Sequence, residues 1–266
     1  MLEVIDTHCH FAAAPAAGEQ AVRQARNAGL AQALVCATHA GDVANVHRYA
    51  HRHGFHYAIG LHPHLITPGM SLCSEIKRFE DLLADKLGDP LLAAVGEIGL
   101  EGDARACSLP LPDQRTLFEA MLAAAQSAGL PVSVHSRKAL AEVYAALKPL
   151  PVTGVLHAFA GSYEQACQFL QLGFKLGFGP TLTYPGSRRI REVFRRLPQQ
   201  AFVLETDAPY MLTCARRASG QNVCQPVDIF EVLQAAAQIR GTDALSIAQA
   251  STRNAREVFA VFAADH

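Results

Sequence analysis

Short apolar runs alternate with longer helical segments along almost the whole sequence. Each run has the length and the content of Val, Ile, Leu and Ala that suit a buried strand, and the segment after it has the pattern of a helix. Strands that are buried on both faces and separated by helices form an all-parallel sheet. Eight such units close naturally into a (β/α)8 TIM barrel, so we predict this α/β fold. The predicted strands are 4–10, 31–36, 56–60, 92–95, 131–135, 152–157, 174–178 and 202–205.

Three of the helical segments end at a glycine, Gly29, Gly54 or Gly129, which is common at helix C-termini. An open doubly wound sheet is the alternative architecture. It would have fewer units and usually a glycine-rich phosphate loop after the first strand, where this chain has His8-Cys9-His10. The predicted helices are 19–28, 42–53, 72–86, 114–128, 139–147, 162–172, 188–197, 227–239, 245–250 and 254–262, with a loop at 213–225.

Composition favours one large soluble domain. The chain has 266 residues, of which 50% are hydrophobic and 18% charged, and no linker or low-complexity tract interrupts it. We therefore predict a single domain over residues 1–266. The formal net charge of −1 excludes a broad basic face, so any nucleic-acid contact must be local.

The cysteines and the apolar segments indicate the cellular compartment of the protein. Seven cysteines, an odd number without a Cys-x-x-Cys pair, argue against a disulfide framework and a zinc ribbon. The first residues lack the features of a signal peptide, and no apolar run has the length of a membrane span. We expect a cytoplasmic protein with reduced thiols, no membrane contact and no obligate protein partner.

Histidines and carboxylates gather at the carboxyl ends of the predicted strands. His8 and His10 are one residue apart on an extended segment, so their side chains leave the same side and can bind one metal ion. The carboxyl ends of barrel strands form the active-site face. Residues at these ends are His8, His10, His39, His62, His64, Glu97, His135, His157 and Asp207. They predict a metal site on that face.

The same strand ends carry motifs that resemble the TatD family of metal-dependent hydrolases and deoxyribonucleases, within the amidohydrolase-like barrels. The resemblance runs from residue 4 to about residue 260. Its motifs are IDTHCH at 5–10, GLHPH at 60–64, GEIGL at 96–100, VHSR at 134–137, LHAFAGS at 156–162 and ETDAPY at 205–210.

The resemblance implies a site with two divalent ions, of Zn, Mn, Mg, Co or Fe. His8, His10 and Asp207 would hold one ion, His135 and His157 would hold the other, and Glu97 would bridge them. One carboxylate shared by two cations offsets their repulsion, and such a pair can grip both oxygens of a phosphoryl displacement. Asp207 would orient the attacking water or take its proton.

The implied reaction is hydrolysis of a phosphodiester ester, with trimming of DNA from its 3′ end. We assign His62 to the substrate phosphate or leaving group, and His64 and Arg137 to substrate contacts. The catalytic residues are then Asp207, Glu97 and His62. Residues 101–103 depart from the family pattern, because they read Glu-Gly-Asp where the family has Asp followed by aromatic residues. We expect the His and Arg residues of helix 42–53 to lie on a solvated face.

Two other functions remain open at this point. One is hydrolysis of a C–N or lactone bond in a small molecule, as in other amidohydrolase-like barrels, although Glu97 stands where many of those enzymes have a modified lysine. The other is a non-catalytic, metal-stabilised binding protein. The proposed metal shells have room for water, which is typical of catalytic sites.

Overall fold

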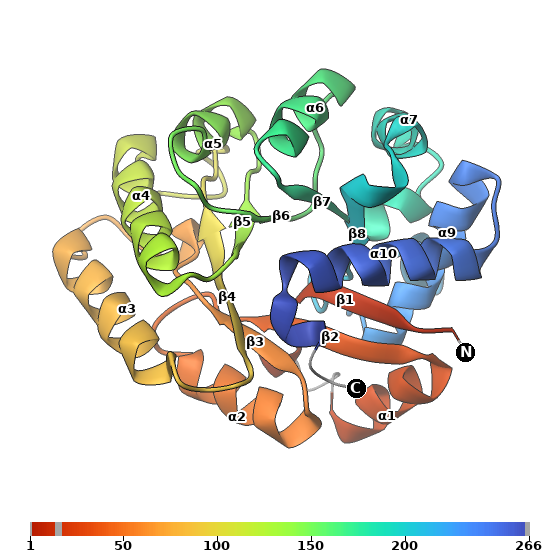
Figure 1. Ribbon diagram of the computed structural model, residues 1–266, viewed down its shortest axis with the longest axis horizontal. Helices are drawn as coiled ribbons and strands as arrows, with labels where there is room; N and C mark the ends of the chain where they lie inside the picture. Colours follow the sequence, from red (N-terminus) through yellow and green to blue (C-terminus); the bar gives the residue numbers. More distant parts are fainter. Residues whose placement is uncertain (1, 14–17, 264–266) are drawn as a thin grey trace.

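The strands form one parallel sheet, as seen in a computed structural model that describes residues 2–13 and 18–263. Neighbours in sequence are neighbours in the sheet, in the order β1 to β8, and helices surround it (Figure 1). This arrangement confirms the predicted (β/α)8 TIM barrel. The strands are β1 Val4–Cys9, β2 Leu30–Cys36, β3 His56–Ile59, β4 Leu92–Gly99, β5 Val132–His135, β6 Gly154–Leu156, β7 Lys175–Phe178 and β8 Phe202–Leu204.

The helices agree with the predicted segments except near the C-terminus. Residues 245–250 and 254–262 were predicted as two helices, but one helix covers most of both, because its buried face of small and apolar residues continues through Ser251 and Thr252. A short helix also lies in the predicted loop at 213–225. The helices are α1 Glu19–Ala28, α2 Val43–His53, α3 Leu72–Lys86, α4 Leu111–Ala128, α5 Leu140–Leu147, α6 Tyr163–Gln171, α7 Arg188–Arg196, α8 Cys214–Ala218, α9 Ile229–Arg240 and α10 Ala244–Val258.

Strand β4 is longer than predicted. Residues 96–99, which follow the predicted strand 92–95, continue the strand, so Glu97 lies within it. Gly99 has a φ of 143°, and a Cβ there would lie 2.0 Å from the carbonyl oxygen of His135. The absence of a side chain therefore lets the end of β4 approach β5 closely, which brings Glu97 beside the strand that carries His135.

Helix α10 closes the amino-terminal end of the barrel. It lies across the strands (Figure 1). Just after its last residue, Phe259 and Phe262 pack against residues such as Ile5 and Val203. Both phenylalanines are buried. Because this end is filled by apolar side chains, the polar residues converge at the opposite end. None of the helices in the described part of the chain is both long and apolar enough to cross a membrane.

Polar contacts join β8 to β1 and complete the ring. Asp6 accepts hydrogen bonds from the Thr206 amide at 3.0 Å and the Thr206 hydroxyl at 2.6 Å. The Thr7 hydroxyl donates to the Leu204 carbonyl at 3.1 Å. The Asp207 amide donates to the His8 carbonyl at 2.9 Å, so the contacts that close the barrel also place two predicted site residues side by side.

Candidate metal centre

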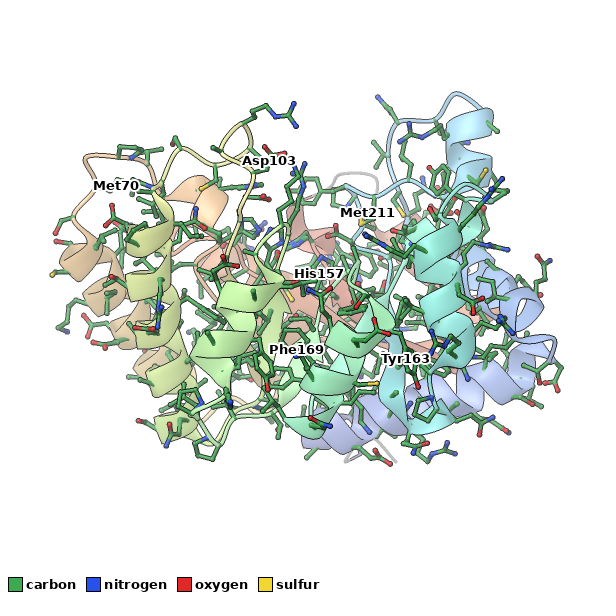
Figure 2. All side chains as sticks on the ribbon, turned by 90° about the horizontal axis from the view of Figure 1, so that it is seen from above. Met70, Asp103, His157, Tyr163, Phe169 and Met211 are labelled. Carbon is green, nitrogen blue, oxygen red and sulfur yellow. The ribbon has the colours of Figure 1, made fainter. Side chains whose placement is uncertain are left out.

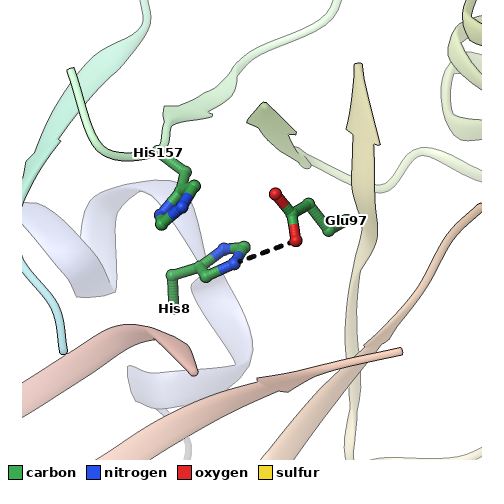
Figure 3. Close-up of side chains that lie close together, drawn as sticks. All are labelled: His8, Glu97 and His157. Atoms are coloured by element: carbon green, nitrogen blue, oxygen red, sulfur yellow. Dashed lines mark ion pairs between the residues drawn. The ribbon is translucent and has the colours of Figure 1, made fainter. Parts of the chain in front are cut away.

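Glu97 lies at the centre of the strand-end cluster and points its two carboxylate oxygens at different histidines. Oε2 lies 3.4 Å from His8 Nε2 and 3.2 Å from His10 Nε2. Oε1 lies 3.3 Å from His62 Nε2 and 3.1 Å from His135 Nδ1. Figure 3 shows Glu97 facing His8, and the ring of His157 stacked on the ring of His8. A carboxylate that offers one oxygen to each side has the geometry of a bridge between two cations.

Asp207 is held in an unusual backbone conformation at the end of β8. Its φ is 52°, in the left-handed region that few residues other than glycine adopt. This conformation directs Oδ1 to within 3.4 Å of His10 Nε2, while Oδ2 lies 3.8 Å from His157 Nε2. Backbone strain of this kind is often found at functional sites.

The outer nitrogens of His8 and His10 contact residues of other strands, Ser133 in β5 and Cys36 in β2. His10 Nδ1 lies 3.0 Å from the carbonyl oxygen of Cys36, which can only accept, so this nitrogen carries the proton. In the neutral ring the Nε2 lone pair then faces the carboxylates. His8 Nδ1 lies 2.8 Å from the Ser133 hydroxyl, and the two Nε2 atoms are 3.2 Å apart. Lone pairs and carboxylate oxygens that face one another favour a cation between them.

His135 and His157 follow the same pattern through two further carboxylates. His135 Nε2 lies 3.3 Å from Glu101 Oε2, which leaves Nδ1 facing Glu97. His157 Nδ1 lies 2.9 Å from Glu205 Oε1, and its Nε2 faces Asp207. A carboxylate behind a ligating imidazole fixes its orientation and raises its basicity. The residues therefore fit the divalent ions that the sequence implies.

His62 has the opposite arrangement. Its Nδ1 accepts the backbone N–H of His64 at 3.2 Å, so the proton of the neutral ring lies on Nε2. That N–H points at Glu97 Oε1. A protonated nitrogen donates rather than ligates, which suits contact with a phosphate or leaving-group oxygen. This difference separates His62 from the four predicted ligand histidines. A ring nitrogen of His62 nevertheless lies within 4.8 Å of ligand atoms of Glu97 and His135.

The grouping of ligand atoms agrees with the prediction for one ion and differs for the other. His8, His10 and Asp207 converge as one group, as expected. His157, predicted to share an ion with His135, groups instead with His8 and Glu97. The reason is that the His157 ring stacks on that of His8, with a centroid distance of 3.6 Å.

The remaining predicted substrate residues lie on the rim. His64 Nε2 lies 3.1 Å from Glu101 Oε2. The guanidinium of Arg137 is half exposed and contacts Glu101 at 3.5 Å and Asp103 at 3.3 Å. Figure 2 shows Asp103 on a loop above His157 at this end of the barrel. Glu101 and Asp103, which depart from the family pattern, therefore hold His64 and Arg137 in place on the rim. His39, also at a predicted strand end, accepts the amide N–H of Asp42 instead.

The carboxylates and imidazoles of the cluster shift one another's pKa values in opposite directions. Burial would raise the pKa of Glu97, but His62 and His8 hold it well below its usual range. Burial would lower the pKa of His157, but the carboxylates of Glu205 and Asp207 raise it to about 9. Buried carboxylates of low pKa that face imidazoles form a pocket of negative potential suited to divalent ions.

Several residues of the site were not identified from the sequence. Ser133, Glu101 and Glu205 contact the outer nitrogens of the histidines, and no sequence signal marks a partner from another strand. Glu205 lies in a quoted motif and is completely buried, which is rare for a glutamate. Gly177 leaves room for it, because a Cβ there would lie 2.2 Å from Glu205 Oε2. Tyr210, from the same motif, is 63% exposed beside the ring of His10.

A comparison with protein families identifies this arrangement. The profile described as TatD related DNase matches residues 5–260. The chain belongs to the TatD family. The uncharacterized metal-dependent hydrolase YjjV of Escherichia coli is 36% identical, and the match covers 97% of this chain and 98% of that protein.

Other members of the TatD family agree in sequence and in fold. A protein of Edwardsiella piscicida named 3′-5′ ssDNA/RNA exonuclease TatD is 33% identical, over 90% of this chain and 92% of its own length. The crystal structure of E. coli YjjV superposes with a TM-score of 0.86 at 34% identity, and covers 97% of this chain and 98% of that one. The chain is therefore a metal-dependent hydrolase of the TatD family.

Proposed function

We propose that this TatD-family chain hydrolyses phosphodiester bonds and removes nucleotides from the 3′ end of single-stranded DNA. The observation that carries the proposal is the common orientation of His8, His10, His135 and His157. Each directs one nitrogen at Glu97 or Asp207 and has a hydroxyl, carbonyl or carboxylate oxygen within 3.3 Å of the other nitrogen. Relatives named as 3′-5′ exonucleases add support.

In this proposal the six predicted ligands hold two divalent ions. Bound there, the ions would polarise the phosphate and lower the pKa of the attacking water. Asp207 orients that water and accepts its proton, since its carboxylate is fixed by the β8 backbone. His62 donates its Nε2 proton in a hydrogen bond to a phosphate or leaving-group oxygen.

The rim residues match a single-stranded substrate. Arg137 and His64 can contact phosphate oxygens once the substrate competes for them with Glu101. The exposed ring of Tyr210 offers a stacking surface for a base at the edge of the centre, with its centroid 5.3 Å from that of His10. Positions 101–103 have no aromatic side chain, so Tyr210 would supply this contact.

Hydrolysis by metal-stripped protein, with Mg, Mn, Zn or Co added back, tests the proposal. The substrates are a single-stranded oligonucleotide and a simple phosphodiester ester. We expect metal-dependent shortening of the oligonucleotide from its 3′ end. Glu97→Ala should abolish it and cost more activity than His62→Ala, because Glu97 faces both groups of histidines. His53→Ala, far from the site, is the control.

Other outcomes point elsewhere. Cleavage of the simple ester with intact DNA would retain a metallohydrolase for small phosphoesters. No cleavage of either substrate would contradict the proposal and direct the search to C–N or lactone bonds. Equal, small losses in Glu97→Ala and His62→Ala would rule out a bridging role for Glu97.

A further inference from the structure

The amino-terminal end of the barrel carries a second cluster of imidazoles and a carboxylate. His47 and His51 lie one helical turn apart on α2, in the segment predicted to be a solvated face. In the structure Arg48, His51 and Arg52 are exposed, as expected, and the rings of His47 and His51 turn toward Asp89, in the loop before β4. Their Nε2 atoms lie 2.9 and 2.8 Å from one atom, Asp89 Oδ2. The two imidazole nitrogens and the carboxylate oxygen lie close enough together to hold one metal ion.

The carboxylate is held in place before any ligand arrives. Asp89 Oδ1 accepts the Leu91 amide N–H at 2.9 Å, and Oδ2 accepts the Tyr57 hydroxyl at 3.0 Å. The His47 ring packs edge-on against the Tyr57 ring, at a centroid distance of 5.5 Å. Orientation of this kind, supplied by residues behind the ligands, is a common property of metal sites.

The spacing of the three atoms suits a small transition-metal ion. Zinc binds imidazole nitrogen and carboxylate oxygen at about 2.0–2.2 Å, which separates the ligand atoms of a tetrahedral site by about 3.3 Å. The observed separations from Asp89 Oδ2 are therefore short by about half an ångström, a difference that small side-chain rotations remove. The side chains of His47 and His51 are 31% and 45% exposed, so an ion can enter from solvent.

We propose that His47, His51 and Asp89 form a second, separate site for one zinc-like divalent ion. Two imidazoles with one carboxylate suit Zn, Co, Ni or Cu, whereas Mg and Ca prefer oxygen ligands. The site lies beside the start of β4, and Glu97 is five residues further along that strand from Leu92, about 17 Å away. The ion takes no part in hydrolysis. It connects α2 to the loop before β4 and stabilises that end of the barrel.

The experiment combines zinc content with the chemical reactivity of individual histidines. Wild type and His51→Gln are dialysed against the same free zinc, and bound zinc is counted per chain. Gln can still donate to Asp89, so the variant keeps the fold, and His53→Gln on the same helix is the matched control. We expect one ion fewer in His51→Gln than in either other protein, with unchanged hydrolysis when metal is in excess.

Acylation of histidines in the wild type locates the site. Modification by diethyl pyrocarbonate, read by peptide mass spectrometry, should fall several-fold at His47 and His51 when zinc is added, but not at His53. Equal zinc content in wild type and His51→Gln would overturn the proposal. Zinc-independent modification of His47 and His51 would overturn it too, and would leave the cluster as a hydrogen-bonded contact between α2 and the loop.

Discussion

Glu205 shows how a residue outside the ligand set can govern it. Its Oε1 accepts the Ala158 amide N–H at 2.7 Å and lies 2.9 Å from His157 Nδ1, so it fixes the ring from behind. We expect Glu205→Gln to lower metal affinity by about 10–100-fold, because the amide supports the ring without the charge that raises its basicity. Competition with a chelator measures this. The exposed Glu164→Gln is the control, and unchanged affinity in Glu205→Gln would contradict the positioning role.

Tyr210 gives a prediction about substrate rather than metal. Stacking of a base on an aromatic ring contributes about 1–3 kcal/mol, or roughly 5- to 150-fold in binding, and we expect an exposed ring to lie near the lower end. We therefore expect Tyr210→Ala to raise KM for an oligonucleotide by about tenfold and to leave hydrolysis of a simple phosphodiester unchanged. Tyr210→Phe keeps the ring, so it should retain the KM of the wild type. Steady-state kinetics on both substrates measure this. Equal losses on the two substrates would assign Tyr210 to the metal centre instead.

At the scale of elements, the first turn of α10 depends on an ionised cap. Asp243 accepts the Ser246 amide N–H at 2.8 Å and the Ser246 hydroxyl at 2.9 Å. These hydrogen bonds lower the pKa of Asp243 below its ordinary value of 3.8. A carboxyl whose pKa is lower in the folded state stabilises the fold above pH 3.8. That contribution disappears as the pH falls through the folded-state pKa.

Asp243→Asn isolates this titration, since asparagine also caps helices but does not ionise. We expect the difference in Tm between wild type and Asp243→Asn to shrink as the pH is lowered from 5 through about 3. Thermal melts of the metal-stripped proteins across this range measure it. A difference in Tm that stays constant with pH would show that the charge of Asp243 does not stabilise α10.

At the scale of the whole molecule, α10 and the residues after it form the floor of the barrel. Phe259 is fully buried among inward-facing residues of several strands. Phe259→Ala should lower the free energy of unfolding by about 3–5 kcal/mol, as is usual when a buried phenylalanine is truncated. Denaturant unfolding at constant metal concentration measures it. Leu245 is exposed on α10, so Leu245→Ala should change stability by less than about 0.5 kcal/mol.

The metal centre is a second determinant of stability at this scale, because its proposed ligands come from the ends of five strands. A ligand at a hundredfold excess over its Kd adds about 2.7 kcal/mol to stability, which raises the Tm by about 5–10 °C. We expect chelation to lower the Tm of wild type by this amount and metal to restore it. Glu97→Gln should show a smaller change. Equal Tm values with and without metal would contradict a centre built across these strands.

Much of the architecture follows from local patterns. The strands and most helices were predictable, because buried parallel strands are short apolar runs and several helices end at a glycine. The extension of β4 and the continuity of α10 were not, since each depends on packing against other elements. Glycine is common in turns, but the missing Cβ of Gly99 instead allows its backbone to lie close to the backbone of His135.

The sequence by itself determined the barrel and the set of residues at one of its faces. A parallel barrel brings every carboxyl strand end to the same side, so chain order and strand position suffice to gather His8, Glu97 and Asp207. Only the tertiary structure decided which nitrogen of each imidazole turns inward. It also decided that His47 and His51 meet Asp89. These features depend on rotamers and on the register between segments far apart in the chain, and no local pattern encodes either.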